Sequence, residues 1–253
     1  MVARAIIDSD SYMWRAALTC NTLVELGKDM FYEAWDLNKA RVYLKETMAS
    51  LTTSAGCGEY VMVTAGKGIN YRKHLYPTYK SNRKKEKRPL MLDKVRDMCK
   101  EEFPMVSIPH LEADDTCRIL LEEDKNNVVV SIDKDLRTFS GKIYDSYHNE
   151  MRFISPQQAE ANFKRQLLMG DKTDGYDGLP KVGLATANKL ILDGITIDEI
   201  TQMYIDKGLG IDEFKKVYNC AKILGKDDYK RGVIMLYGGE KFDCETIRNT
   251  IYQ

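Results

Sequence analysis

The chain has 253 residues, a length that favours one large domain with a small appendage. With 43% hydrophobic residues but only 6 prolines and 17 glycines, its composition is that of a globular protein and not of a disordered one. No apolar stretch approaches the roughly 20 residues of a membrane-spanning helix, and acids among the first residues exclude a secretory signal. We therefore expect a cytoplasmic protein (host cytoplasm if the source is a virus) that makes no membrane contact.

Basic and acidic residues balance at 38 each, but they are unevenly distributed. Residues 72–88 include eight Lys or Arg and one Glu, whereas the acids gather in short clusters elsewhere. This separation predicts that one part of the protein binds phosphates and another binds cations. The six cysteines form no C-x-x-C pair and do not lie near the histidines, so we expect buried thiols and neither a zinc site nor a disulfide framework.

Strands and helices alternate in the first part of the chain. Apolar runs predict strands at 5–7, 60–64, 127–132 and 143–144, and the clearest helical pattern between them covers 38–51. This order predicts an α/β fold with a mostly parallel central sheet flanked by helices. Ligands of such sheets bind beyond the carboxyl ends of the strands, where Asp8 and the pair Asp133 and Asp135 fall.

The second part of the chain is predicted to be helical. Ser155 and Gln158 form a capping box for a helix that runs to about Met169. Glycine turns then separate further helices, which we place at 184–192, from 196 onward, at 211–224 and at 227–237. We place the domain boundary near residue 165, so that an α/β core covers 1–165 and a helical region covers 166–253.

Eight acids stand in four places, at spacings that put the members of each motif on one side of a helix or strand. They are Asp8, Glu112, Asp114, Asp115, Asp133, Asp135, Asp171 and Asp174. Packed together without cations they would repel one another, whereas Mg²⁺ takes oxygen ligands. Each motif alone is common as a helix cap, a turn or a solvated loop. Together, without His or Cys, they indicate a two-metal site for phosphoryl transfer.

Tyrosines alternate with cations in the basic segment, as in Tyr71-Arg72 and Tyr79-Lys80. Cations neutralise phosphates, and a tyrosine ring can stack on any base, so this pattern favours nucleic-acid binding. A solvated basic surface over packed tyrosines is the alternative.

A glycine turn at 178–183 precedes the helix predicted at 184–192. Its backbone N–H groups next to a helix N-terminus would bind phosphate. The turn is neither a Walker loop nor a dinucleotide fingerprint, because Leu184-Ala185 follows it and no strand precedes it. An ordinary corner between two helices is the alternative.

These motifs, in this order, resemble the flap endonuclease and 5′→3′ exonuclease family, which includes the 5′-nuclease domain of bacterial DNA polymerases. The likeness is greatest to the short exonucleases of tailed phages. It rests on Asp8-x-x-Ser11-Tyr12-x-x-Arg15, Tyr71-Arg72 to Arg83, Glu112 to Asp115, Ile132 to Asp135, Gly170 to Asp174, and Gly178 to Leu190. It spans about seven-tenths of the chain. The resemblance implies a PIN-like nuclease core, a helical arch within about 71–100, and a C-terminal helix–hairpin–helix region.

The resemblance also implies two metal ions, Mg²⁺ with Mn²⁺ as a substitute. Asp8, Glu112, Asp114 and Asp115 would serve one ion, and Asp133, Asp135 and Asp171 the other, with Asp174 nearby. Lys80 would contact the scissile phosphate. The remaining DNA contacts would come from Arg15, Arg72, Tyr79 (stacked on the terminal base), Arg83, Lys84 and Lys85, and from the hairpin residues Gly178, Lys181, Val182 and Gly183, commonly with K⁺.

One departure from the family concerns the acid that many members carry seven residues before the arginine of the basic segment. That position is Ala65, and the stretch Thr64 to Gly68 contains no acid. One ion could therefore be held more weakly, or through water, with reduced activity. Asp10 is an additional acid in the first motif, and the sequence leaves open whether it compensates.

The function that we expect is that of a metal-dependent 5′→3′ exonuclease or flap endonuclease in DNA replication or repair. It would act as a monomer on 5′ ends of duplex or flapped DNA, and RNA primers annealed to DNA are further candidate substrates. One alternative is a structure-specific DNA-binding module with a weak or inactive site, for which Ala65 is the support. The other is a Mg²⁺-dependent aspartyl phosphatase, suggested by Asp8-x-Asp10 after a strand.

Overall fold

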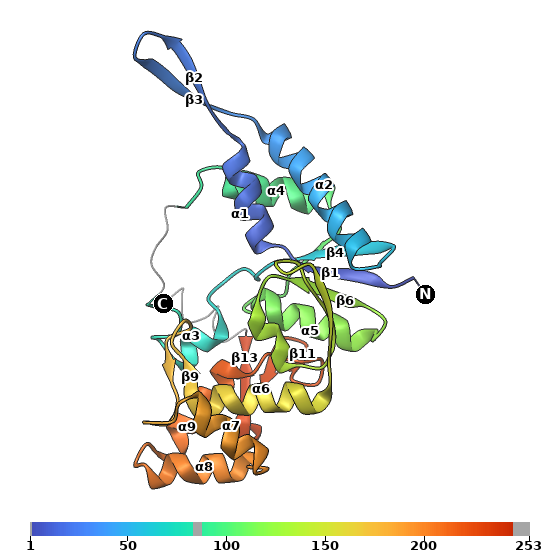
Figure 1. Ribbon diagram of the computed structural model, residues 1–253. Helices are drawn as coiled ribbons and strands as arrows, with labels where there is room; N and C mark the ends of the chain where they lie inside the picture. The colour runs from blue at the N-terminus through green and yellow to red at the C-terminus, as the bar shows by residue number, and fades with distance from the viewer. Residues whose placement is uncertain (1, 83–87, 245–253) are drawn as a thin grey trace.

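A six-stranded sheet forms the centre of the computed structural model, which describes residues 2–82 and 88–244 apart from the side chains of 23, 31–33, 134 and 135 (Figure 1). Neighbouring strands are parallel except β7 and β8, in the order β5-β4-β1-β6-β7-β8. The strands are β1 (Arg4–Asp8), β4 (Glu59–Val63), β5 (Met105–Val106), β6 (Val128–Ser131), β7 (Gly141–Asp145) and β8 (Glu150–Ile154). The predicted α/β class with a mostly parallel sheet is confirmed.

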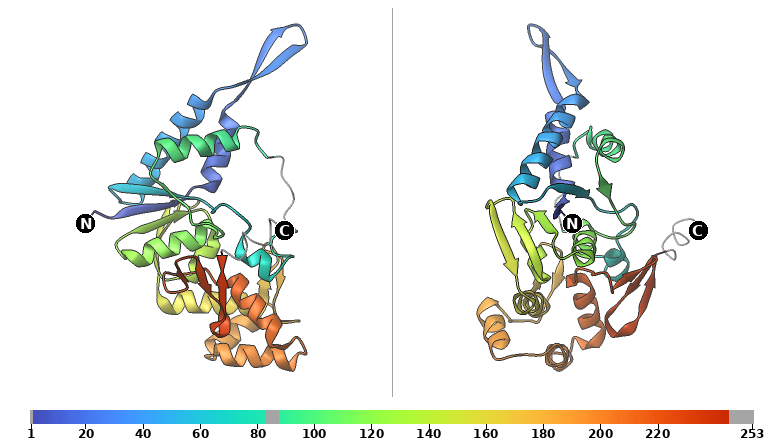
Figure 2. Two further views of the ribbon diagram at one scale, coloured as in Figure 1. Left: turned by 180° about the vertical axis from the view of Figure 1, so that it is seen from behind. Right: turned by 90° about the vertical axis from the view of Figure 1, so that its right-hand side faces the viewer.

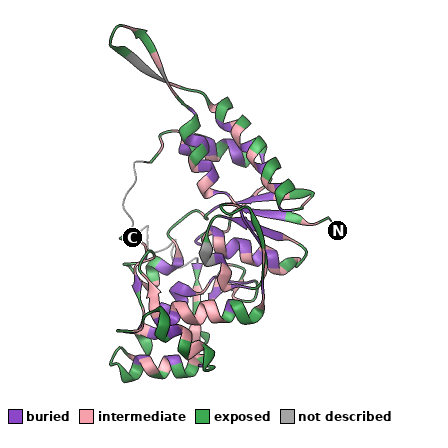
Figure 3. Ribbon diagram, viewed as in Figure 1, coloured by how far each residue is buried: buried purple, intermediate pink, exposed green. Residues whose placement is uncertain are grey.

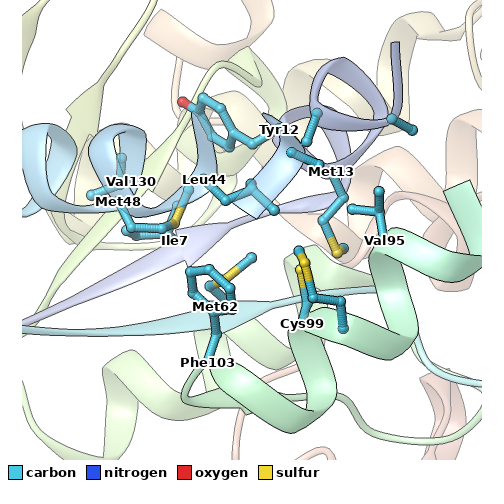
Figure 4. Close-up of a cluster of buried hydrophobic side chains, with 14 of the residues drawn as sticks. Ile7, Tyr12, Met13, Leu44, Met48, Met62, Val95, Cys99, Phe103 and Val130 are labelled. Atoms are coloured by element: carbon cyan, nitrogen blue, oxygen red, sulfur yellow. The ribbon is translucent and has the colours of Figure 1, made fainter. Parts of the chain in front are cut away.

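Helices cover both faces of the sheet. On one face lie α1 (Asp10–Thr19), α2 (Leu37–Ser54) and α4 (Leu92–Glu102); on the other lie α5 (Ala113–Glu123) and α6 (Pro156–Met169). Successive β1 side chains enter opposite cores, Ile7 beside Met13 and Leu44 (Figure 4), and Ile6 beside Cys117. Burial on both faces explains why the central strands read as uninterrupted apolar runs, and Figure 3 shows the buried residues concentrated along them.

A two-stranded ribbon that the sequence analysis did not predict connects α1 to α2. It consists of β2 (Asn21–Gly27) and β3 (Met30–Trp35), which pair antiparallel and project away from the sheet (Figures 1 and 2). The turn between them includes Asp29 at φ +63°, a conformation typical of tight hairpin turns. Among the described residues the ribbon pairs with no other sheet, so it lies outside the central parallel sheet that the sequence predicted.

The C-terminal part begins with helices and ends in a small sheet. The capping boxes at Ser155 and Thr196 are present, at the starts of α6 and α8 (Ile197–Asp206); the predicted boundary at 165 falls inside α6. The other helices are α7 (Leu184–Leu192) and α9 (Gly210–Ala221).

The helix predicted at 227–237 is wrong. That region contains β11 (Tyr229–Lys230), β12 (Val233–Met235) and the first residue of the 3-10 turn η2 (Tyr237–Gly239), and the sheet is completed by β13 (Lys241–Asp243).

The error at 227–237 has a local cause. Arg231 and Gly232 both have positive φ. This conformation is incompatible with a helix but is usual in a tight turn between antiparallel strands. Ile234 then points into a core with Tyr71 and Leu111, so tertiary packing fixes the strand. No helix among the described residues is long and apolar enough to cross a membrane.

Two glycines bring the chain into close contact after α6. Gly170 and Gly178 flank the short hairpin of β9 (Gly170–Asp171) and β10 (Tyr176–Asp177). A Cβ on Gly178 would lie 2.3 Å from the Gly170 nitrogen and 2.5 Å from the Leu168 oxygen. These are backbone atoms, which cannot relieve a clash by changing rotamer as a side chain can. This hairpin carries Asp171 and leads into the turn before α7, so the two glycines set the position of both.

We expect Gly178→Ala to destabilise the protein by about 1–3 kcal/mol, because the new methyl group would force backbone apart. Gly183→Ala is the matched control, since a Cβ there meets nothing within 4 Å and its φ is not positive. Urea unfolding of both variants measures the difference. Equal stability of the two would contradict the close approach.

Candidate active site

Two carboxylates lie at adjacent strand ends. Asp8 is the last residue of β1, and Asp133 follows the neighbouring parallel strand β6 by two residues. Ser131, the last residue of β6, contacts both segments: its hydroxyl donates to the Asp8 carboxylate (3.1 Å) and accepts from the Asp133 backbone N–H (3.0 Å). The sheet topology therefore brings together acids that are far apart in the chain, as the sequence predicted for this edge.

A third carboxylate comes from the first turn of α5. Burial raises the pKa of Asp114 well above its usual value, and the charges of Asp8 and Asp133 raise it further. Burial likewise raises the pKa of Asp8 to about 7, with Asp10 and then Asp133 adding to it. The negative charge of Asp133 thus acts on both Asp8 and Asp114, and the protein alone does not fully compensate that charge.

Lys80 brings a positive charge to these acids and partly offsets the raised pKa of Asp114. It lines a small cavity of about 30 Å³ with Glu112, Asp114, Asp133 and Asp174. Its ammonium lies 2.6 Å from a Glu112 oxygen and 3.6 Å from Asp174. Its backbone, at φ +54°, donates to the Asp174 carbonyl (2.7 Å). The basic segment is thereby fixed to the loop that carries Asp174.

Glu112 is held as a carboxylate. Burial alone would raise its pKa, but Arg72 and Lys80 outweigh burial and lower it. The Tyr79 hydroxyl lies 2.9 Å from a Glu112 oxygen and 3.0 Å from an Asp174 oxygen, and its one proton is shared between them, so one tyrosine links two predicted ligands.

The acids fit a divalent cation by their charge and chemistry. Asp8, Asp114 and Asp133 could hold an ion, which would offset the repulsion that raises the pKa values of Asp8 and Asp114. Among the described side chains, no three His, Cys, Asp or Glu lie close enough together to enclose a metal ion. An ion such as Mg²⁺ keeps several waters, so it needs only one or two direct carboxylates.

Asp115 and Arg72 do not have the roles predicted from the sequence. The Asp115 carboxylate is fully buried and forms two 2.7 Å bonds with the Arg72 guanidinium. It also accepts from the backbone N–H groups of Glu112 and Leu224. Arg72 is 2% exposed and donates to backbone carbonyls of Cys220 and Lys222 as well. Asp115 is therefore not placed to bind a metal, and Arg72 is not placed to contact DNA.

Tyr79 is also placed differently from the prediction. Its ring is 2% exposed and stacks at 6.5 Å on Tyr176, inside the core of the C-terminal part. A buried ring cannot stack on a terminal base without leaving that core. Its hydroxyl, which orients Glu112 and Asp174, is the part that reaches the site.

Asp171 is not among the residues that line the cavity with Asp174. One of its oxygens accepts from the backbone N–H groups of Thr173 (2.7 Å) and Asp174 (3.2 Å), which shapes the loop. Asp171 lines a neighbouring cavity of about 270 Å³ with Arg137 and Arg165. The side chain of Asp135 lies outside the described residues, so its role as a ligand stays a prediction, as does that of Asp171.

Some of the residues predicted to contact DNA are exposed, and others are packed into the protein. Arg15 on α1 and, in the turn before α7, Lys181 and Gly183 are exposed and available to phosphates. Val182 packs partly into the C-terminal core, and Gly178 is needed for the close backbone contact. Three further predicted contacts lie outside the described residues: Arg83, Lys84 and Lys85.

Two further residues contribute to the site: Ser131, which the sequence analysis did not include, and Asp10, which it named as an additional acid without assigning it a role. Ser131 orients Asp8. Asp10 accepts hydrogen bonds from the Thr64 hydroxyl (2.6 Å) and the Ala65 N–H (2.9 Å), so it reaches the end of β4. The signal for Ser131 was its place directly before the Ile132-Asp133 motif, at the end of a buried strand.

The comparisons with known proteins identify the family and agree with the fold. The model of the 5′-3′ exonuclease N-terminal resolvase-like domain matches residues 4–164, more than half of the chain. The chain belongs to the 5′-3′ exonuclease family. It is a nuclease of the flap endonuclease and 5′-exonuclease group. A curated exodeoxyribonuclease from Enterobacteria phage T3 is 24% identical over 243 residues, which cover 87% of this chain and 80% of that protein.

Solved structures show the same fold. The D15 protein of phage T5, crystallised with metal ions, superposes with a TM-score of 0.65 at 16% identity, covering 87% of this chain and 89% of that one. The T5 5′-exonuclease with bound zinc gives a TM-score of 0.61 at 16% identity, covering 85% and 89%. The catalytic core of Rad2 with DNA gives 0.54 at 15% identity, covering 99% and 86%. At these identities the likeness shows the fold.

We expect Arg72→Met to destabilise this family member by about 3–5 kcal/mol, because it leaves the Asp115 carboxylate buried without a partner. Arg4→Met is the control, since the Arg4–Glu59 pair is exposed and 3.6 Å apart. Urea unfolding compares the two. Adding Asp115→Leu to Arg72→Met should restore part of the stability, and a double variant no better than the single one would contradict the uncompensated charge.

We also expect divalent ions to bind more weakly at pH 6 than at pH 8. In the folded protein the pKa of Asp8 is about 7, above the ordinary value of 3.8, so the folded state holds this proton more tightly than the unfolded state. Without metal, the free energy of unfolding therefore falls as the pH rises from 3.8 to about 7. A cation competes with the proton that the folded protein holds there. Calorimetry with Ca²⁺ in buffers of different ionisation enthalpy measures the proton release. Asp8→Asn should reduce it, and an affinity independent of pH in the wild type would contradict the coupling.

Proposed function

We propose that this protein is a divalent-metal-dependent nuclease that hydrolyses phosphodiester bonds near 5′ ends of duplex or flapped DNA. The observation that carries the proposal is the meeting of Asp8, Asp114 and Asp133 at one sheet edge, beside Lys80. Mg²⁺ is the ion that we propose, with two ions in the active state and Mn²⁺ as a substitute. A bound ion would supply activation of the attacking water and neutralisation of the leaving oxygen.

The chain's own residues would then position the DNA strand. Lys80 is proposed to exchange its contact with Glu112 for one with a non-bridging oxygen of the scissile phosphate, where it offsets the developing charge. Glu112 stays ionised because Arg72 and Lys80 lower its pKa. Arg15, exposed on α1 near Tyr12, would hold a neighbouring phosphate.

DNA as the substrate is supported by the family and by its relatives. The D15 flap endonuclease of phage T5 has been solved with DNA and metal ions, at 17% identity and a TM-score of 0.61. In this chain, the exposed turn at Lys181 and Gly183 precedes α7, whose first N–H groups can bind a phosphate of the duplex. We propose that residues 166–253 bind duplex DNA there, with K⁺ between backbone and phosphate.

The same proposal includes the segment 71–100. Its described parts are α3 (Tyr71–Leu75), the turn that carries Lys80, and α4, with residues 83–87 outside the described chain. We propose that this segment forms an arch over the site, with Arg83, Lys84 and Lys85 on the single strand. RNA primers annealed to DNA are a second proposed substrate, and the monomer is the proposed active form.

We expect Asp114→Asn and Lys80→Ala each to lower the cleavage rate by on the order of 10²–10³ while DNA binding is largely retained. The substrate is a 5′-flap duplex labelled at its 3′ end, incubated with Mg²⁺ and separately with EDTA. Glu46→Gln, on the exposed side of α2, is the control and should cleave normally.

The outcomes separate the proposal from its alternatives. Products that vanish with EDTA and in Asp114→Asn support the nuclease, and their lengths distinguish flap incision from stepwise digestion. Wild-type binding to the flap without cleavage in Mg²⁺ or Mn²⁺ would favour the non-catalytic module. Normal turnover by Lys80→Ala would remove that residue from the mechanism.

A further inference from the structure

Three neighbouring parallel strands, β4, β1 and β6, end at the edge where the candidate site lies. Asp8 ends β1, and Asp133 follows β6. The end of β4 is level with Asp8, because Asp8 and Val63 are register partners, but the stretch Thr64 to Gly68 contains no acid. At two of these three strand ends, therefore, an acid stands at the end of the strand or just after it.

Asp10 places a carboxylate at the third strand end. It is the first residue of α1, and its backbone N–H donates to Asp8. Its side chain extends to the end of β4, where one oxygen accepts from the Thr64 hydroxyl (2.6 Å) and the other from the Ala65 N–H (2.9 Å). Both bonds come from the residues that follow β4 directly, so they fix the carboxylate at that position.

Pairing with Arg96 of α4 does not by itself account for Asp10. One guanidinium nitrogen lies 3.1 Å from the carboxylate, and the two side chains are 35% and 31% exposed. Such a single-contact, partly exposed pair contributes little to stability, in contrast to the bidentate buried pair of Arg72 and Asp115. Within the described part of the chain, the oxygen that accepts from Ala65 accepts one hydrogen bond, and a carboxylate oxygen can accept two.

We propose that Asp10 is a further carboxylate of the metal site, which supplies at the end of β4 the negative charge that position 65 lacks. It would hold a divalent cation, or a water of its shell, through the oxygen bound to Ala65. This inference rests on the proposed metal-dependent function. It assigns Asp10 a role in cation affinity and not only in the packing of α1 against α4.

The test measures Mn²⁺ binding to the DNA-free protein by calorimetry. Asp10→Asn should weaken binding by about 10–100-fold, as loss of a carboxylate in or near a metal shell does. Ala65 is exposed, so an acid can be placed there without overpacking. The double variant Asp10→Asn with Ala65→Asp should regain most of the affinity, because it returns a carboxylate to the same strand end.

Arg96→Gln separates this role from a structural one. It breaks the same ion pair but keeps the carboxylate, so Mn²⁺ affinity should stay equal or increase as a competing cation is removed. If Asp10 served only to hold Arg96, Asp10→Asn and Arg96→Gln would lower the melting temperature alike and leave Mn²⁺ affinity unchanged, which would overturn the inference. Absence of Mn²⁺ binding by the wild type would overturn the metal-dependent function itself, whereas wild-type binding with an unaffected Asp10→Asn would overturn only the role of Asp10.

Discussion

The buried pair of Arg72 and Asp115 is the interaction on which the arrangement of the site depends. It joins three parts of the chain: α3, the start of α5, and the C-terminal end of α9, where the carbonyls of Cys220 and Lys222 also accept from Arg72. A buried ion pair contributes modestly to net stability, but removing one partner is costly. Its effect is therefore mainly to fix the relative positions of these three segments. Glu112 and Asp114 are held in place as a consequence, because they lie on the same turn as Asp115.

Around that fixed frame the site keeps an excess of negative charge. Lys80 offsets Glu112 and Asp174, but Asp8 and Asp114 retain pKa values raised by burial and by neighbouring acids. A chain that folds with such repulsion loses stability at neutral pH, which a bound cation would restore. The same repulsion would keep a DNA phosphate away from the empty site. Cation binding and substrate binding are thus expected to be coupled through these carboxylates.

The sequence predicted the fold class and the edge of the sheet where the acids meet, because both follow from local patterns. Apolar runs ending at Asp8 and before Asp133 identify strands and their carboxyl ends. The sequence could not show which acids of the Glu112 to Asp115 motif face the site and which one forms a structural ion pair. That distinction depends on Arg72, which lies 43 residues before Asp115 and contacts it only in the folded chain. Nor could the sequence predict the strand at Val233, whose Ile234 is fixed by packing against distant residues.

Tyr79 illustrates the same limit from the basic segment. Alternation of tyrosines and cations is typical of a surface that stacks on bases, yet the Tyr79 ring is packed against Tyr176, which lies almost one hundred positions later in the chain. Local pattern cannot distinguish a ring that faces the ligand from one that faces the core. The hydroxyl group was the better indicator of a role, because the hydroxyl of a buried tyrosine needs a hydrogen-bond partner. Here Glu112 and Asp174 are the partners.

The geometry at Asp10 also bears on the aspartyl phosphatase alternative. That chemistry needs the second acid of an Asp-x-Asp motif to be free to exchange a proton with the leaving group. Both oxygens of Asp10 instead accept hydrogen bonds, from Thr64 and Arg96 at one oxygen and from Ala65 at the other. These three donors hold the carboxylate toward the end of β4. A carboxylate held in this way suits an acceptor of positive charge better than a proton donor, which favours a metal-binding role over acid catalysis.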